Sequence, residues 1–132
     1  AYDDHGSMKG SVEEFIAAAR EFLQRWTVTQ HFMGNMLIEV DGDQARAETY
    51  AVACHRREDA EGNGKDDLIG VRYVDRFERR AGQWKIAHRV VAAEWRRVDE
   101  VRGARGRGAL GVWGRRDTDD VIHWIMTARS PT

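Results

Sequence analysis

The sequence predicts an α+β fold, in which helices pack against an antiparallel sheet. Residues 11–26 have apolar side chains at the i, i+3 and i+4 spacing of an amphipathic helix. Four later segments favour β-strands, and a glycine-bearing turn or loop separates each from the next. No repeat divides the 132 residues. We therefore predict a single domain with a core at 1–98 and a C-terminal arm and short helix at 99–132.

The helix is expected over residues 11–26. Ser11 and Glu14 have the S-x-x-E spacing of a capping box, in which each side chain satisfies a backbone N–H at the helix start. Residues 1–5 before it are compatible with the end of a strand that is followed by a turn through Gly6 and Gly10. The apolar stripe of the helix consists of Val12, Phe15, Ile16, Ala19, Phe22, Leu23 and Trp26.

The four strands are expected at residues 27–40, 44–57, 68–80 and 84–98, with turns at 41–43 and 81–83 and a polar loop at 59–67. Alternate side chains share a face of a strand. The first strand therefore groups His31, Met33, Asn35 and Leu37, and the second groups Ala45, Ala47, Thr49, Ala51 and Ala53. The third groups Ile69, Val71, Tyr73, Asp75 and Phe77. The small residues of the second strand leave room above that face.

Charge and composition exclude several classes of function. The net charge of −1 argues against a nucleic-acid partner, although residues 101–116 form an arm rich in glycine and arginine. No apolar run reaches the length of a membrane span. The single cysteine, Cys54, fits a reducing compartment, and we expect a cytoplasmic protein. Apolar residues on the outer sheet face, Tyr50, Val52 and Val74, favour a homodimer or homotrimer.

His31 and Asp75 are the candidate catalytic residues, because each places an ionisable group on a strand face that is otherwise apolar. An imidazole titrates near neutral pH and exchanges protons in a pocket. Asp75 would orient His31 and balance its charge. Structural alternatives stay open: a buried histidine bonded to its neighbours, and an ion pair of Asp75 with Arg46, Arg89 or another arginine.

The same faces supply candidate substrate-binding residues. Tyr73 offers a phenol donor for a substrate oxygen, with a core aromatic as the structural alternative. The other candidates are Asn35 and Thr49 as polar pocket residues, His5 at the rim, and Met33 and Val71 in the apolar lining.

The remaining histidines, His55, His88 and His123, are expected to be structural or exposed. The five histidines show no H-x-x-x-H or H-x-H spacing. We therefore expect no metal site and no cofactor.

Six segments together resemble the SnoaL-like branch of the nuclear transport factor two-like superfamily. Their order and spacing produce the resemblance, which covers nearly all of residues 1–98. The segments are AYDDHG (1–6), GSVEEF (10–15), TQHFMGN (29–35), VDGDQARA (40–47), GVRYVD (70–75) and GQWKI (82–86).

The resemblance implies a cone-shaped α+β barrel, in which a curved antiparallel sheet wraps around helices and encloses a pocket. Relatives include polyketide cyclases, scytalone dehydratase, bile acid dehydratase and lindane dehydrochlorinase. In the dehydratase and dehydrochlorinase relatives, the histidine of a segment like TQH at 29–31 is the general base, which implies that role for His31. Fold alone does not determine function.

Two departures from the family pattern matter. The family's N-terminal helix pair, with an aspartate and often a tyrosine of the active site, is missing from these 132 residues. Three explanations stay open: the helices belong to a longer chain, the product is incomplete, or a partner chain fills the gap. Scytalone dehydratase also has a second catalytic histidine on the next strand. Thr49 aligns with that position, which argues against the same chemistry.

The sequence therefore predicts a small cofactor-free lyase or isomerase of the dehydratase, dehydrohalogenase or cyclase type. His31 would abstract a proton from an apolar, ring-containing substrate, and no nucleic acid or membrane would be involved. The alternative is a non-catalytic protein, either a ligand-binding module or a structural subunit like the small subunit of ring-hydroxylating dioxygenases.

Overall fold

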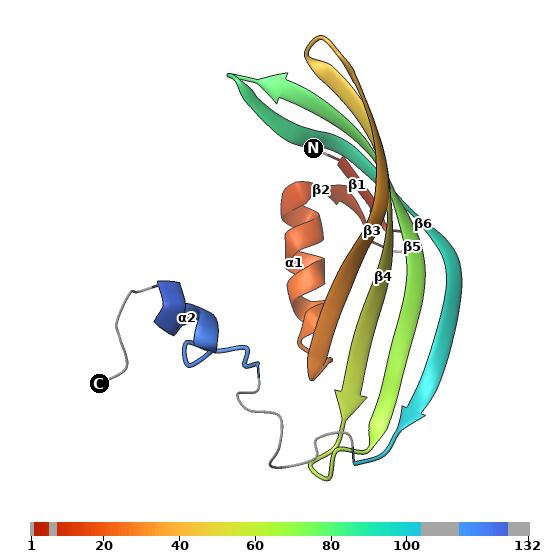
Figure 1. The fold of residues 1–132 in the computed structure, drawn as a ribbon, viewed down its shortest axis with the longest axis vertical. Helices are drawn as coiled ribbons and strands as arrows, with labels where there is room; N and C mark the ends of the chain where they lie inside the picture. Colours follow the sequence, from red (N-terminus) through yellow and green to blue (C-terminus); the bar gives the residue numbers. More distant parts are fainter. Residues whose placement is uncertain (1, 6–7, 104–113, 127–132) are drawn as a thin grey trace.

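A computed structural model describes residues 2–5, 8–103 and 114–126. Six strands form one sheet in the order β2-β1-β6-β5-β4-β3. The sheet curves around helix α1 (Figure 1), which confirms the predicted α+β fold with a curved antiparallel sheet. The strands are β1 (Tyr2–His5), β2 (Met8–Ser11), β3 (Val28–Asp41), β4 (Gln44–Glu58), β5 (Gly64–Arg80) and β6 (Gln83–Val101), and the helices are α1 (Val12–Leu23) and α2 (Val121–Met126).

The N-terminal strands extend the sheet beyond the four predicted segments. β1 pairs with β6 in parallel, with Tyr2 opposite His88, and β2 pairs with β1 in antiparallel register. A strand at residues 1–5 was compatible with the sequence, but β2 was not predicted. Because β2 is four residues long, it has too short a pattern to recognise, and its existence depends on the long-range pairing of β1 with β6.

Helix α1 begins where the sequence predicts. Ser11 is the N-cap, its hydroxyl accepts from the Glu14 N–H at 3.2 Å, and the Glu14 carboxylate accepts from the Ser11 N–H at 2.8 Å. The helix ends at Leu23, three residues before the predicted end. Beyond it, the Trp26 N–H reaches the Leu23 carbonyl in a tighter turn, and the Arg116 guanidinium donates to the carbonyls of Leu23 and Trp26.

The inner face of the sheet is set by the pairing of β4 with β5, which continues without a register shift from Gln44 opposite Glu78 to Glu58 opposite Gly64. Paired residues project from the same face. The predicted alanine-rich face of β4 therefore lies beside the predicted Tyr73 face of β5. The buried residues on this inner face are Ala45, Ala47, Thr49, Ala51, Ala53, His55, Asp67, Val71, Tyr73 and Asp75.

A β-bulge in β3 corrects one predicted face. The register shifts between Met33, opposite Ala51, and Met36, opposite Thr49, so that residues 34 and 35 together oppose Tyr50. Past the bulge the alternation is inverted, and Leu37 pairs with Glu48 on the outer face. The prediction that Asn35 and Leu37 share the face of His31 is therefore wrong.

The polar loop after β4 is also shorter than predicted, because β5 begins at Gly64. Asp66 and Asp67 were assigned to the loop for their charge. In the structure, Arg56 binds both carboxylate oxygens of Asp66, and Arg96 binds both of Asp67. Paired with arginines on neighbouring strands, the two carboxylates fit into a strand that their residue types alone disfavour.

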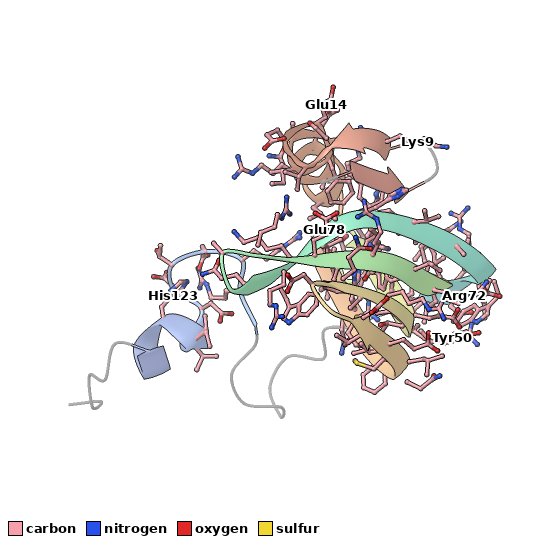
Figure 2. The ribbon with its side chains drawn as sticks, turned by 90° about the horizontal axis from the view of Figure 1, so that it is seen from above. Lys9, Glu14, Tyr50, Arg72, Glu78 and His123 are labelled. Atoms are coloured by element: carbon pink, nitrogen blue, oxygen red, sulfur yellow. The ribbon has the colours of Figure 1, made fainter. Side chains whose placement is uncertain are left out.

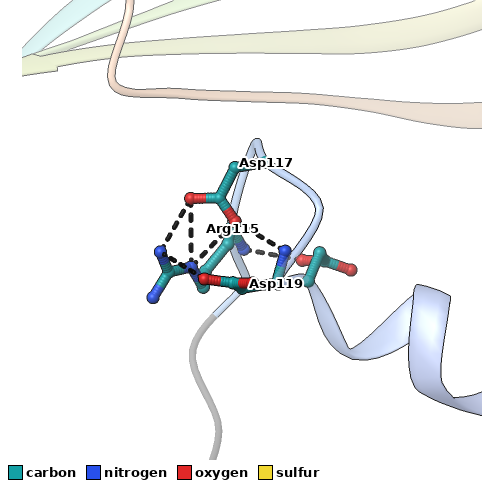
Figure 3. Close-up of polar contacts among 4 residues, drawn as sticks. Arg115, Asp117 and Asp119 are labelled. Atoms are coloured by element: carbon teal, nitrogen blue, oxygen red, sulfur yellow. Dashed lines mark hydrogen bonds and ion pairs between the residues drawn. The ribbon is translucent and has the colours of Figure 1, made fainter.

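Much of the C-terminal arm, residues 104–113 and 127–132, lies outside the described residues. β6 continues to Val101, past the predicted core boundary at 98. Arg115 bonds to Asp117 and lies 3.4 Å from Asp119 in the turn before α2 (Figure 3). The predicted helix at 117–128 begins only at Val121, where Asp120 accepts from the Ile122 N–H.

The outer face of the sheet carries exposed apolar side chains. Tyr50 and Val74 are 40% and 42% exposed, and Phe32 on β3 is 68% exposed. The Arg72 guanidinium lies over the Tyr50 ring at 6.0 Å (Figure 2). The homodimer or homotrimer stays a prediction that rests on this face. Within the described ranges, no helix has the length and apolar character needed to cross a membrane.

Replacing Ser11 by Ala should lower the free energy of unfolding by about 1 kcal/mol, because it removes the hydroxyl that accepts from the Glu14 N–H. Urea unfolding followed by circular dichroism measures the change. Glu13→Ala, at an exposed first-turn position without a capping bond, is the control and should change stability by less than about 0.5 kcal/mol. An equal loss in both variants would contradict the cap assignment.

Candidate functional site

His31 lies at the edge of the inner face and is exposed. Strand β3, which carries it, is the last strand of the sheet. The Tyr73 hydroxyl lies 3.5 Å from His31 Nδ1, and the His55 ring contacts the His31 ring edge-on, with 5.5 Å between centroids and 87° between planes. His31, Tyr73 and His55 thus come together from three adjacent strands.

His55 is the site residue that the sequence analysis missed. It was expected to be structural or exposed; it is 6% exposed, on the inner face beside His31. The signal was present, because alternation from Ala45 through Ala53 continues to position 55. The position that aligns with the second catalytic histidine of scytalone dehydratase is Thr49, and His55 lies six residues further along the same strand. Its partners on the helical side are Phe22 and Trp26, at centroid distances of 5.6 and 5.3 Å.

The environment of His55 favours a neutral imidazole. Burial lowers the pKa of His55 from its ordinary value, and the nearby His31 lowers it further, while Asp67 opposes both. His55 Nδ1 is buried and has no hydrogen-bond partner within the described part of the chain. A buried polar atom without a partner is costly. His55 is therefore suited to bond with a ligand or a water molecule.

Asp67 lies opposite His55 but is occupied by Arg96. The two residues are cross-strand partners, and Arg96 donates to both oxygens of Asp67 at 2.8 and 2.6 Å. Hydrogen bonds from Arg96 lower the pKa of Asp67 despite the opposing effect of burial. Asp67 therefore stays ionised near His55 without taking its proton.

Asp75 is bound to Arg89, which was one of the two alternatives. Arg89 Nε and one terminal nitrogen donate to the two carboxylate oxygens, each at 2.7 Å. The Arg89 guanidinium also lies over the Tyr73 ring, 4.4 Å from its centroid. Both oxygens of Asp75 are therefore engaged by Arg89, and Tyr73 stands between this pair and His31.

The other predicted binding residues are divided between the two faces. Thr49 and Val71 are buried on the inner face beside Tyr73, and Met33 lies on the same face, 46% exposed. Asn35 is in the bulge and lines an outer-face cavity of about 440 Å³ with Phe32, Tyr50 and Trp95. The backbone of His5 is part of β1, and its side chain lies outside the described residues.

An open cavity adjoins His55 on the inner side of the sheet. Its volume is about 600 Å³, and its lining includes His55, Phe22, Trp26, Ile69 and Trp95. It shares Trp26, Asp67 and Arg96 with a second cavity of about 560 Å³, which Arg57 and Lys65 also line. The two cavities place an aromatic compartment at His55 and a charged compartment next to it.

The described residues contain no cluster of three or more His, Cys, Asp or Glu side chains that could hold a metal ion. The side chains that meet at this site carry imidazole, phenol and guanidinium groups. The expectation of no metal and no cofactor stays a prediction.

The free energy of unfolding should fall as the pH decreases from the ordinary His pKa of 6.5 through the lowered pKa of His55. In that pH window His55 is protonated in the unfolded chain but stays neutral in the folded protein, so protonation favours unfolding. His55→Gln should flatten this dependence in urea titrations. Asp66 and Asp67 lose their stabilising effect only below 3.8. An identical pH dependence in wild type and His55→Gln would contradict the assignment.

Solved structures with similar folds agree with this architecture. Kfla4162 from Kribbella flavida has a TM-score of 0.64 at 18% identity, covering 73% of this chain and 70% of its own. A candidate scytalone dehydratase from Novosphingobium aromaticivorans has a TM-score of 0.61 at 16% identity, covering 83% and 74%. A type 2 hexachlorocyclohexane dehydrochlorinase, LinA, has a TM-score of 0.60 at 18% identity, covering 74% and 66%.

Sequence comparison assigns the family. No curated protein matches the sequence. Residues 1–90 match the family model of the SnoaL-like domain, which is more than half of the chain. The chain therefore belongs to the SnoaL-like domain family, in the SnoaL-like branch of the nuclear transport factor two-like superfamily.

Proposed function

We propose that this protein is a cofactor-free lyase or isomerase of the dehydratase, dehydrohalogenase or cyclase type. The observation that carries the proposal is the convergence of His31, His55 and Tyr73 from three adjacent strands, with Tyr73 Oη 3.5 Å from His31 Nδ1. A base and a phenol donor at this separation both reach one small molecule. The similar folds of the dehydratase candidate and of LinA add support at the level of fold.

His31 acts as the general base in this proposal. Exposed at the edge of the inner face, it removes a proton from a carbon next to an activating group, while Tyr73 donates a hydrogen bond to a substrate oxygen. In a dehydration, the proton taken by His31 leaves with the departing hydroxyl as water. In a dehydrohalogenation, the halide departs as an anion and His31 releases the proton to solvent. In a ring closure, His31 returns the proton to the cyclised product.

In this proposal His55 supports the base His31, because the His55 imidazole is neutral. Its ring lies against His31, and its Nδ1 has no partner in the described part of the chain. A neutral imidazole next to His31 avoids the repulsion that a second positive charge would exert on a protonated base. Its Nδ1 accepts a hydrogen bond from a substrate hydroxyl or a bound water.

The substrate class follows from the cavity beside His55. The aromatic rings of Phe22 and Trp26 meet His55 beside a space of about 600 Å³, which suits a small apolar molecule with one or more rings. The oxygen or halogen at the reacting centre lies toward Tyr73 and His31. A hydroxylated steroid, a terpenoid or an aromatic polyketide has these properties.

The test is turnover of a panel of hydroxylated and halogenated cyclic compounds, followed by mass spectrometry for loss of water, loss of hydrogen halide or isomerisation. His31→Gln should lower kcat/KM by about 100-fold or more, because it removes the base. Tyr73→Phe should lower it by about tenfold or more, because it removes the donor.

His88→Gln is the matched control, because His88 pairs with Arg76 on the outer face of the sheet. It should leave turnover unchanged. An unchanged kcat/KM in His31→Gln would contradict the proposal. Tight binding of a panel compound without any reaction would favour the alternative, a non-catalytic ligand-binding protein.

A further inference from the structure

We propose that Arg89, fixed by Asp75, is a positioning residue that holds Tyr73 against His31 and strengthens its phenol as a hydrogen-bond donor. The inference deepens the proposed function and rests on it, because it concerns the donor of the same reaction. It also assigns Asp75 a task other than direct contact with His31: Asp75 acts through Arg89 and Tyr73.

The ion pair between Asp75 and Arg89 holds the Arg89 guanidinium in one orientation. Two parallel hydrogen bonds of 2.7 Å join the guanidinium to both carboxylate oxygens, and Asp75 is 5% exposed. A planar fork that is bound at two nitrogens to a buried carboxylate has little freedom to rotate. The plane and position of the Arg89 cation are therefore set by Asp75.

Arg89 uses this fixed position to cover Tyr73. The register pairs Asp75 with Arg89 and Tyr73 with Val91, so the guanidinium reaches across to the ring of the next inner-face residue on β5, 4.4 Å from its centroid. A cation over a ring face attracts its electron density and favours the ionised form of a phenol. The same effect makes the neutral phenol a better donor.

The Tyr73 ring has little space to move elsewhere. It is 6% exposed and packs in the core cluster with Ala51 and Val71, with Val91 against it. Its hydroxyl ends 3.5 Å from His31 Nδ1. The titratable and charged groups around Tyr73 include His31 from β3, Arg89 from β6 and, through Arg89, Asp75 on its own strand. Its partner on β4 is Thr49, which has no charge.

The chain contains a matched control pair. Arg56 and Asp66 form the same two-bond arrangement, at 2.6 Å for each bond, and their side chains are 26% and 15% exposed. Their strand positions place them on the outer face. Arg56 covers no aromatic ring within the described ranges, so its removal tests the loss of an ion pair without the loss of a stacked cation.

The experiment measures the ionisation of Tyr73 directly. The three tyrosines are replaced by 3-fluorotyrosine, whose phenol ionises at lower pH, and fluorine NMR follows each signal across a pH titration. Tyr73→Phe assigns the signal. Arg89→Gln should raise the pH midpoint of Tyr73 ionisation by at least about half a pH unit, Arg89→Lys should restore part of the shift, and Arg56→Gln should change nothing.

Arg89→Gln leaves the buried carboxylate of Asp75 without its partner, and this could unfold the protein. A second variant covers that case. Asp75→Asn with Arg89→Gln replaces the ion pair by two amides that can bond to each other, and the midpoint should again rise. An unchanged midpoint in either folded variant, or an equal shift in Arg56→Gln, overturns the proposal.

The result is separable from the proposed function. With a substrate identified, Arg89→Gln should lower kcat several-fold while KM changes little, because a positioning residue acts on the reacting geometry. If the fluorine titration fails while His31→Gln abolishes turnover, this inference falls and the lyase or isomerase proposal stands. If no compound is turned over but the titration shifts, the role of Arg89 stands and the proposed reaction does not.

Discussion

The pairing of β4 with β5 is the constraint on which the rest of the structure depends. It continues along both strands without a register shift, and it determines which side chains of these two central strands face inward together. Alanines on β4 and larger residues on β5 fill that face in alternation with polar ones. The β4 side chains are small, and Phe22 on α1 and Trp26 in the turn after it contact His55 on this face, with a cavity beside them.

Charged residues on the inner face are accommodated by pairing between adjacent strands. Asp67 with Arg96, and Asp75 with Arg89, are two-bond ion pairs between β5 and β6. Removing either partner would leave a charge in a poorly solvated place. Asp67 lies near His55 and stays ionised there, because both of its oxygens already accept hydrogen bonds from Arg96. The imidazole of His55 therefore stays available for a hydrogen bond to a ligand.

The bulges change which face of the sheet the side chains occupy, and they limit the stretches in which the alternation is regular. The bulge in β3 returns the chain to the inner face at Met36, and register shifts in the pairing of β5 with β6 fall on either side of the segment that carries Val71, Tyr73 and Asp75. Between the two shifts, alternation is regular and brings Tyr73 and Arg89 into contact. Bulges bend and twist strands, which agrees with the curvature of the sheet around α1 (Figure 1).

The sequence by itself determined the helix start, the four long strands and the inner faces of β4 and β5, because capping boxes and alternation are local patterns. It also identified His31, Tyr73 and Asp75 as polar groups on inward faces. Only the tertiary structure decided their partners. The bulge that moved Asn35 away from His31 depends on pairing with β4, and the choice of Arg89 for Asp75 depends on the register with β6. His55 became a site residue because α1 and His31 close over it, and such contacts between segments distant in the sequence have no local signature.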